Sequence, residues 1–165
     1  MNLQSGAAAA SLPMVHALDP VAAVVAQSCL HLDHKQYDKY LDLMTDDCRY
    51  SIRYYSPDIG RDMVLLDHDK PNLANLLTAI VSHVTLPGRL LRQASVCAVE
   101  TDAGGDVAVT STIIVIHTDL DGTSRLFCAG RYQDRMRVDA GKLRLAAREV
   151  VLDTRDLGPG CHYPI

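Results

Sequence analysis

Residues 107–153 read VAVTSTIIVIHTDLDGTSRLFCAGRYQDRMRVDAGKLRLAAREVVLD, and this stretch decides the fold class. It contains three runs rich in β-branched and other apolar residues, separated by short turns that contain Asp and Gly. The pair Asp121-Gly122 is a strong hairpin signal. A fourth run of the same kind, Leu90–Thr101, comes just before and also ends at a Gly-containing turn. Long strands joined by short turns predict an antiparallel meander of four strands.

The residues before the meander carry a helical pattern instead. Asp19-Pro20 predicts a helix start, because Asp can accept hydrogen bonds from free backbone N–H groups and Pro fits the first helical position. Apolar residues then recur at helical spacing. The elements predicted in this half are a helix from Asp19 to a polar break at His31–His34, a second helix that ends in a turn at Thr45-Asp46-Asp47, a strand over Cys48–Tyr55, a loop over 56–68, and a third helix from about Asp69 to Val84.

Early helices followed by a series of strands predict an α+β fold with helices packed on one face of a curved, mostly antiparallel sheet. The length of 165 residues fits one domain. Residues 1–18 are rich in Ala, Ser and Pro and carry no period, so we predict a flexible N-terminal leader at 1–18 and a single domain over 19–165.

The charge balance excludes some classes of partner. The chain has 16 basic and 20 acidic residues and a net charge of −4. It has no dense Lys/Arg run, which a nucleic-acid or anionic-membrane surface needs. No apolar stretch approaches the roughly 18 residues of a transmembrane helix, and no Lys or Arg precedes Lys35, so a basic secretory n-region is missing. We therefore predict a cytoplasmic protein with no nucleic acid and no membrane as partner.

The strand over 107–118 is apolar on both faces, which requires cover on both sides. Helices can cover only one side. The other cover is expected from a curled part of the same sheet or from another subunit. The next strand places Arg131, Gln133 and Arg135 together on one face, a mixed polar surface that suits a subunit interface.

Three segments carry a resemblance to a known family. The first is LDHKQYDKYL (32–41) leading into TDDCRY (45–50), the second is AGRYQDR (129–135), and the third is REVVLDT (148–154), followed by a tail that ends in a Pro-aliphatic pair. In order and spacing they resemble the small (β) subunits of Rieske non-haem iron aromatic-ring-hydroxylating oxygenases. The resemblance runs from about residue 20 to the end of the chain.

The resemblance implies a cone-shaped fold shared with nuclear transport factor 2 and ketosteroid isomerase. It also implies a large α subunit as partner, which carries a Rieske [2Fe–2S] cluster and a mononuclear Fe(II). The two subunits would form an α3β3 hexamer with β–β contacts. A ferredoxin and a reductase would be indirect partners. The role implied for this chain is structural, with no catalytic residue, cofactor or metal of its own. Residues 63–77 depart from the commoner aromatic pattern, so the substrate of the complex is either aromatic or a small organic acid or sulfonate.

A metal site is a second alternative that the residues offer. His31, Asp33, His34 and His68 offer the ligand types of a non-haem iron triad, but His31 and His34 straddle a predicted helix break. A Rieske cluster needs two Cys and two His on close loops, whereas the pair Cys161-His162 stands alone.

The main alternative is a standalone cone-fold isomerase, dehydratase or ligand-binding protein with its own acid–base pocket. Tyr37, Tyr50, His117 and Asp134 are the candidates to line such a pocket. Strand alternation places Asp134 on an apolar face, and Arg148 on the next strand is a candidate partner. A buried carboxylate must be paired or protonated, so we favour a structural ion pair over a catalytic base.

The strand arginines have two possible roles, an anion-binding patch or inter-subunit contacts. Arg is enriched at protein interfaces because its planar head group has several donors. We therefore predict a subunit interface. Its candidate residues are Arg89, Arg92, Arg131, Gln133, Arg135 and Arg148.

Overall fold

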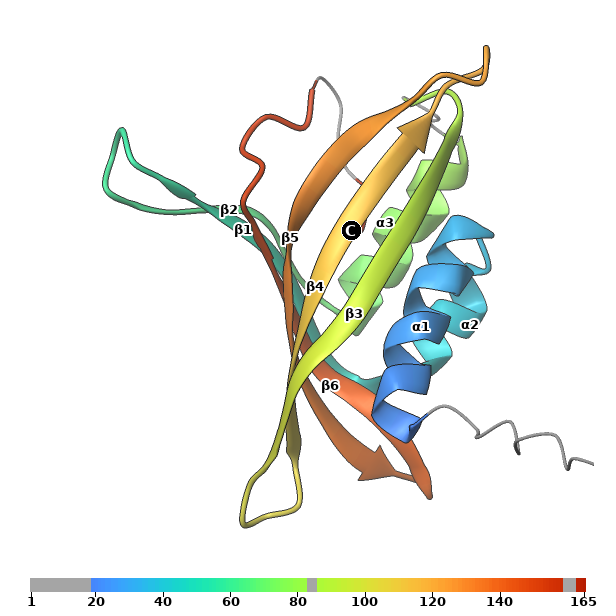
Figure 1. Cartoon of the computed structure of the whole chain (residues 1–165). Coiled ribbons are helices and arrows are strands. Elements are labelled where there is room, and N and C mark those ends of the chain that lie inside the picture. Colours follow the sequence, from blue (N-terminus) through green and yellow to red (C-terminus); the bar gives the residue numbers. More distant parts are fainter. Residues whose placement is uncertain (1–18, 83–85, 159–162) are drawn as a thin grey trace, which may run out of the picture.

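The computed structural model describes residues 19–82, 86–158 and 163–165 (Figure 1). The predicted leader at 1–18 and the pair Cys161-His162 lie outside the described residues. The elements, in chain order, are α1 (Pro20–Asp33), α2 (Tyr37–Asp42), β1 (Met44–Ser56), β2 (Arg61–Asp69), α3 (Lys70–Ser82), β3 (Arg89–Thr101), β4 (Val107–Thr118), β5 (Ser124–Asp139) and β6 (Lys142–Leu152).

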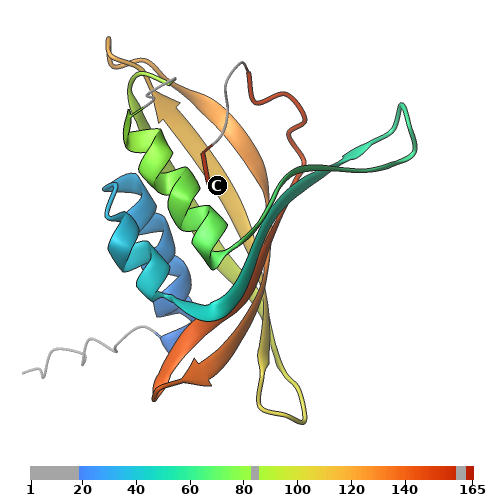
Figure 2. The same ribbon diagram turned by 180° about the vertical axis from the view of Figure 1, so that it is seen from behind.

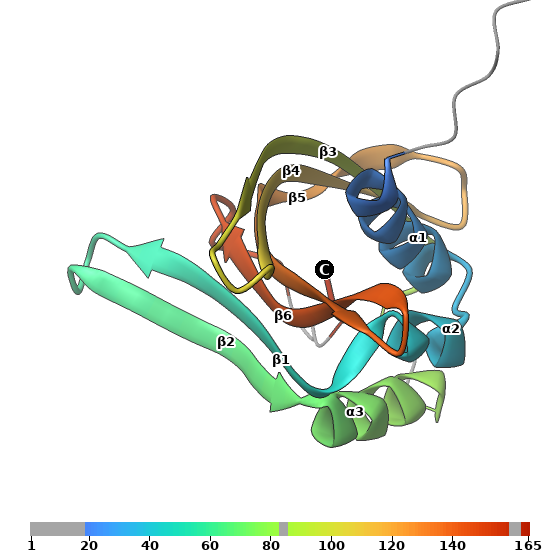
Figure 3. The same ribbon diagram turned by 90° about the horizontal axis from the view of Figure 1, so that it is seen from below.

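All six strands form one sheet in the order β2-β1-β6-β5-β4-β3. The predicted meander is confirmed, since β3 to β6 pair in series and antiparallel. The first half of the chain joins it through a parallel pairing of β1 with β6. Seen from below, β3 to β6 curl around an interior that contains the end of the chain, and α1 closes the opening of the curl (Figure 3).

The three helices lie on the same side of the sheet, against its concave face (Figure 2). The predicted start of α1 is confirmed, because Asp19 caps the helix through a 2.9 Å hydrogen bond from the Val21 amide. One face of α1 is buried against the sheet, and α3 buries Leu73 and Leu77 on its own inner face. Among the described residues, no helix is long and apolar enough to cross a membrane.

Three predictions about the first half of the chain need correction. The segment 56–68 is not a loop, because residues 61–69 form β2 and pair with β1 in a hairpin that projects from the body (Figures 1 and 3). The turn predicted at Thr45-Asp46-Asp47 is the start of β1 instead. There Met44 pairs with β6, and the Asp46 and Asp47 side chains point to solvent, where they bind basic partners. The predicted break at His31–His34 is also shorter, since α1 continues to Asp33.

The strand β4 has one covered face and one open face. Val109, Ile113 and Val115 are buried on the concave side. On the convex side, Ile114 remains 46% exposed, and Leu126 on the neighbouring strand is 63% exposed. Within the described residues, the sheet therefore does not supply the second cover that the sequence pattern requires.

Candidate functional site

The concave face of the sheet buries an ion pair between two neighbouring strands. Asp134 on β5 and Arg148 on β6 are direct cross-strand partners, and neither side chain is exposed. Arg148 Nε donates to Asp134 Oδ1 at 2.8 Å and Nη2 donates to Oδ2 at 2.7 Å. The pair is thus bidentate, the strongest geometry of an arginine–carboxylate contact.

The rest of the Arg148 guanidinium is also held in place. Nη1 donates to the Ser28 hydroxyl of α1 at 2.8 Å, and the Tyr132 ring lies 3.9 Å from the guanidinium carbon. Burial alone would lower the pKa of Arg148, but Asp134 raises it above its ordinary value, so the group stays charged. Because both Asp134 oxygens accept from Arg148, the predicted structural ion pair is present and the carboxylate is not placed to act as a free base.

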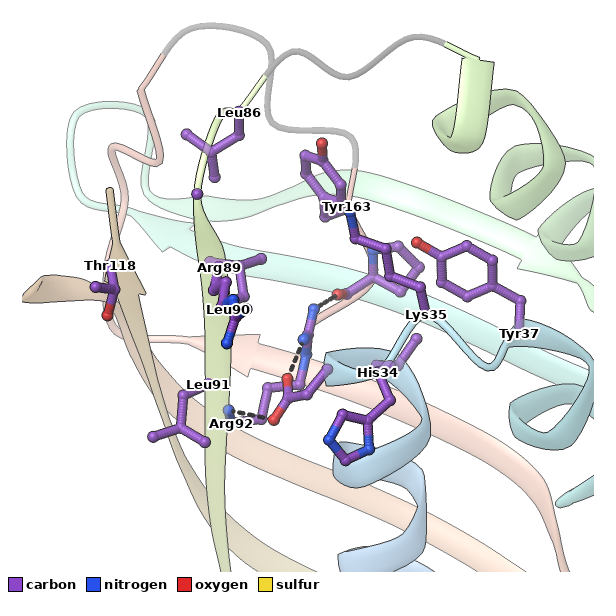
Figure 4. A pocket seen from close by; sticks show the side chains of 14 residues that line it. His34, Lys35, Tyr37, Leu86, Arg89, Leu90, Leu91, Arg92, Thr118 and Tyr163 are labelled. Carbon is purple, nitrogen blue, oxygen red and sulfur yellow. Dashed lines mark hydrogen bonds and ion pairs between the residues drawn. The ribbon is translucent and has the colours of Figure 1, made fainter. Parts of the chain in front are cut away.

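A second buried arginine closes the mouth of the cone. Arg92 on β3 donates through Nη1 to Asp33 Oδ1 at 2.6 Å, and its backbone N–H donates to Oδ2 at 3.0 Å. Nη2 donates to the carbonyl oxygen of Pro164 at 2.6 Å (Figure 4). Arg92 therefore ties the end of α1 and the last described segment, 163–165, to the sheet.

The segment 163–165 fills the interior of the cone. Ile165 is completely buried. The Tyr50 hydroxyl donates to the backbone oxygen of Ile165 at 3.1 Å and accepts from the backbone N–H of Ile165 at 2.8 Å. The space in which a cone-fold enzyme would need a cavity is therefore occupied by this chain's own residues.

The four residues proposed for an acid–base pocket do not meet. Tyr50 and Asp134 are buried and bonded inside, whereas Tyr37 lines the mouth. The His117 ring, at the end of β4, shares a 2.7 Å hydrogen bond with the Pro87 carbonyl oxygen. Burial raises the pKa of Tyr50 well above its usual value, so its hydroxyl stays protonated.

The proposed metal ligands are also separated. His31 bonds to Gln36 at 3.0 Å, Asp33 is bound by Arg92, and His68 lies on β2. The described part of the chain brings no group of three His, Cys, Asp or Glu side chains into a metal-binding arrangement.

The predicted interface residues divide into two groups. The side chains of Arg92 and Arg148 are 3% and 0% exposed and bind partners within the chain, so they cannot reach a neighbouring subunit and leave the candidate set. Arg131, Gln133 and Arg135 are exposed on the convex face, and Arg89 is exposed near the mouth of the cone.

A pocket of about 710 Å³ opens at this mouth, between the end of α1, the start of β3 and the segment 163–165 (Figure 4). Its volume lies in the range of small-molecule sites. Sequence reasoning missed it, because its walls come from three distant parts of the chain.

The sequence model described as the ring-hydroxylating beta subunit matches residues 27–158. The chain belongs to this family. The beta subunit of methanesulfonate monooxygenase hydroxylase from Methylosulfonomonas methylovora is 32% identical over an alignment of 158 residues, which covers 90% of this chain and 87% of that protein. The beta subunit of 2-aminobenzenesulfonate 2,3-dioxygenase from Alcaligenes sp. is 33% identical over 134 residues, covering 81% and 89%.

Among solved structures, the chain resembles a beta subunit from Novosphingobium aromaticivorans that is assigned to an aromatic-ring-hydroxylating dioxygenase. The TM-score is 0.78 at 24% identity, covering 88% of this chain and 95% of that one. The predicted α+β cone fold and the predicted family are thereby confirmed.

The three segments that resembled this beta-subunit family are in contact with one another or with the core. Asp134 of the second segment pairs with Arg148 of the third. The Ala129 carbonyl oxygen accepts from the Asp153 amide at 2.9 Å, and the Thr154 hydroxyl accepts from the Ala129 amide at 3.0 Å. The second and third segments of the family signature therefore hold β5 and β6 together in this chain.

Proposed function

We propose that this beta-family chain is the non-catalytic structural subunit of the terminal hydroxylase of a multicomponent Rieske oxygenase. Three copies would hold three large α subunits in an α3β3 assembly, so that electrons pass from the Rieske [2Fe–2S] cluster of one α subunit to the mononuclear Fe(II) of the next. A ferredoxin and a reductase would deliver the electrons, in the cytoplasm. Family membership supports the large subunit as partner.

The observation that carries the structural role is the open convex face of the sheet. Ile114, Leu126 and Leu91 are 46%, 63% and 56% exposed there, whereas Val109, Ile113 and Val115 are buried on the other face of β4. Exposed apolar area of this kind marks an interaction site when it is contiguous and rimmed by polar groups. The cross-strand register brings these three side chains close together, since Ile116 of β4 lies opposite both Leu91 and Leu126.

The polar rim lies further along the same face. Every second residue in this part of β5 has an exposed side chain, namely Arg131, Gln133 and Arg135. Gln133 and Arg135 also line a hollow of about 310 Å³ between β3, β4 and β5. An apolar centre with an arginine-containing rim has the composition of a protein–protein interface, so we propose this face for contacts with α or with a second β subunit.

The names of two relatives indicate the substrate class. They are subunits of enzymes named for methanesulfonate and 2-aminobenzenesulfonate. We propose that the complex containing this chain hydroxylates a sulfonate or a related aromatic or small organic acid, and that the reacting atoms are bound by the large subunit.

Native mass spectrometry combined with iron analysis tests this proposal. The protein is purified from its source in gentle salt. The expected species is a coloured complex several times heavier than the chain, with all the iron in a larger subunit. An iron-free homodimer or monomer, or turnover by the isolated small chain, would contradict the structural role.

Two matched variants test the proposed face. Ile114→Asp places a charge at the centre of the convex face and should release the small subunit from the complex. Leu30→Asp places the same charge at a site on α1 that is 51% exposed, on the helical side, and should leave the complex intact. Equal effects of the two variants would refute the assignment of the face.

A further inference from the structure

We propose that the pocket at the mouth of the cone is a binding site for a small organic anion on the small subunit itself. The inference goes beyond the structural role, because that role requires no ligand on this chain. The described residues that line the pocket come mainly from the end of α1, the start of β3 and the segment 163–165.

The first argument is the charge of the lining. Lys35, Arg89 and Arg92 contribute three permanent positive charges, and His34 adds a fourth when protonated. Among the lining residues, Asp33 is the one acid, and Arg92 already neutralises it. Two cations therefore remain uncompensated in a chain whose net charge is −4. Such a local excess of positive charge attracts an anion.

The second argument is that these charges have no other evident use. In the part of the chain that the structure describes, the Lys35 and Arg89 side chains form no ion pair or hydrogen bond, whereas the other strand arginines near the sheet surface mostly have acidic partners.

The third argument is the backbone at Lys35. This residue follows the end of α1 with φ of +55°, a left-handed conformation that normally selects Gly at this position of a helix end. A side chain there costs conformational energy. A requirement for the Lys35 ammonium group in ligand binding would explain why a lysine is kept at this cost. Figure 4 shows Lys35 between Tyr163 and Tyr37 on one side of the pocket.

The other residues that line the pocket indicate what the rest of the ligand is, apart from its negative charge. The rings of Tyr37 and Tyr163 and the side chains of Leu86 and Leu90 give the pocket a substantial apolar lining beside the cations. Inorganic anions gain nothing from such walls, whereas a carboxylate or sulfonate with an apolar body uses both parts. The ligand class is therefore an organic acid rather than phosphate or sulfate.

The test is isothermal titration of the full chain with benzenesulfonate, and with uncharged benzenesulfonamide as the matched control. We expect saturable binding of benzenesulfonate with a dissociation constant of about 1 mM or tighter. The affinity should fall as salt is added, because ions screen exposed charges. The sulfonamide should bind at least about threefold more weakly. Absence of saturable binding, or equal binding of the two compounds, overturns the proposal.

Variants connect the binding to the pocket. Lys35→Gln and Arg89→Gln should each weaken benzenesulfonate binding by about threefold, and the double variant by about tenfold, the size expected for exposed charge pairs. Arg61→Gln removes the same charge on the projecting hairpin, where the side chain is exposed and unpaired, and should have no effect. Unchanged binding in the double variant, or an equal loss in the hairpin variant, refutes the site.

Lys35→Gly separates binding from folding. Glycine fits the positive φ, so the melting temperature should rise by about 2 °C. Affinity should nevertheless fall by about threefold, while Lys35→Arg, which keeps the charge, retains binding. A glycine variant that binds as well as the parent chain would show that the lysine is not part of the site.

Discussion

Replacing Asp134 by Asn removes the negative charge that neutralises Arg148 and keeps the size of the side chain. In the folded chain, Arg148 would then be a fully buried guanidinium with one amide oxygen in place of a bidentate carboxylate. The remaining contacts with Ser28 and the Tyr132 ring cannot replace a countercharge. Breaking one side of a buried ion pair in this way costs about 3–5 kcal/mol.

This loss is large for a domain of this size, whose whole stability is about 5–15 kcal/mol. With a urea dependence of about 2 kcal/mol per molar, the urea midpoint should fall by about 2 M, and the melting temperature by about 10 °C. The assay is urea unfolding of the isolated chain followed by circular dichroism, since the chain has no Trp.

The paired replacement Asp134→Leu with Arg148→Met is the informative control. It removes both charges together, so its free energy of unfolding should lie much closer to that of the parent chain than either single variant does. An Asp134→Asn variant within about 1 kcal/mol of the parent chain would refute the reasoning, because the carboxylate would then not be stabilising a buried charge.

Three other predictions follow from burial. Burial raises the pKa values of Tyr40, Tyr50 and Tyr132 above the unfolded value of about 10. The stability linked to these three hydroxyls is therefore complete below about pH 10, and above it the free energy of unfolding falls by about 4 kcal/mol per pH unit for the three together. Urea unfolding at several alkaline pH values measures this loss, and a flat profile would contradict it. Among the described cysteines, Cys97 should react first with iodoacetamide, because the others are buried and burial raises the pKa of two of them; peptide mapping identifies the labelled residue, and equal labelling would contradict the burial. Gly130→Ala should cost about 2 kcal/mol, since the added Cβ would collide with a backbone carbonyl oxygen of β6, and an unchanged melting temperature would exclude that collision.

The elements with strong local signals were predictable. The Asp-Gly turn after β4 and the alternation along the last four strands specify a meander without reference to the rest of the chain. Asp19-Pro20 likewise specifies the start of α1 by capping chemistry alone. The cone shape was predicted from the three segments that resemble the family, because the alternation of apolar and polar residues along a strand does not specify how the sheet curves.

The missed elements lack such signals. The hairpin strand β2 contains Met63 to Leu66, four consecutive apolar residues without alternation. It projects from the body and pairs only with β1, so no half-buried face imposes a period of two. At Asp46 and Asp47, turn chemistry predicted a break, but the segment stays extended within β1. The register of β1 with β6 shifts there, between Met44 and Arg49, and both acids remain in solvent.

The site was predictable only where its partners share neighbouring strands. Asp134 and Arg148 fall on the same face by alternation, and their pairing was expected. Arg92 was assigned to an interface, although it has the same strand parity as Leu90 and Ala94, which face inward; that parity is the signal that could have corrected it. Its partners Asp33 and Pro164 are 59 and 72 residues away, a distance over which sequence patterns carry no pairing information.

The parallel pairing of β1 with β6 has a consequence for how the chain is made. β1 emerges from the ribosome before β2 to β5, but β6, the strand that covers its second edge, emerges only after all of them. Until then, the backbone edge beside Tyr50 and Ile52 has no hydrogen-bonding partner, and unpaired edges of this kind recruit other chains. Non-local pairings also fold slowly. The nascent chain should therefore depend on chaperones until β6 has emerged, and productive encounters with a large subunit can begin only after that strand is in place.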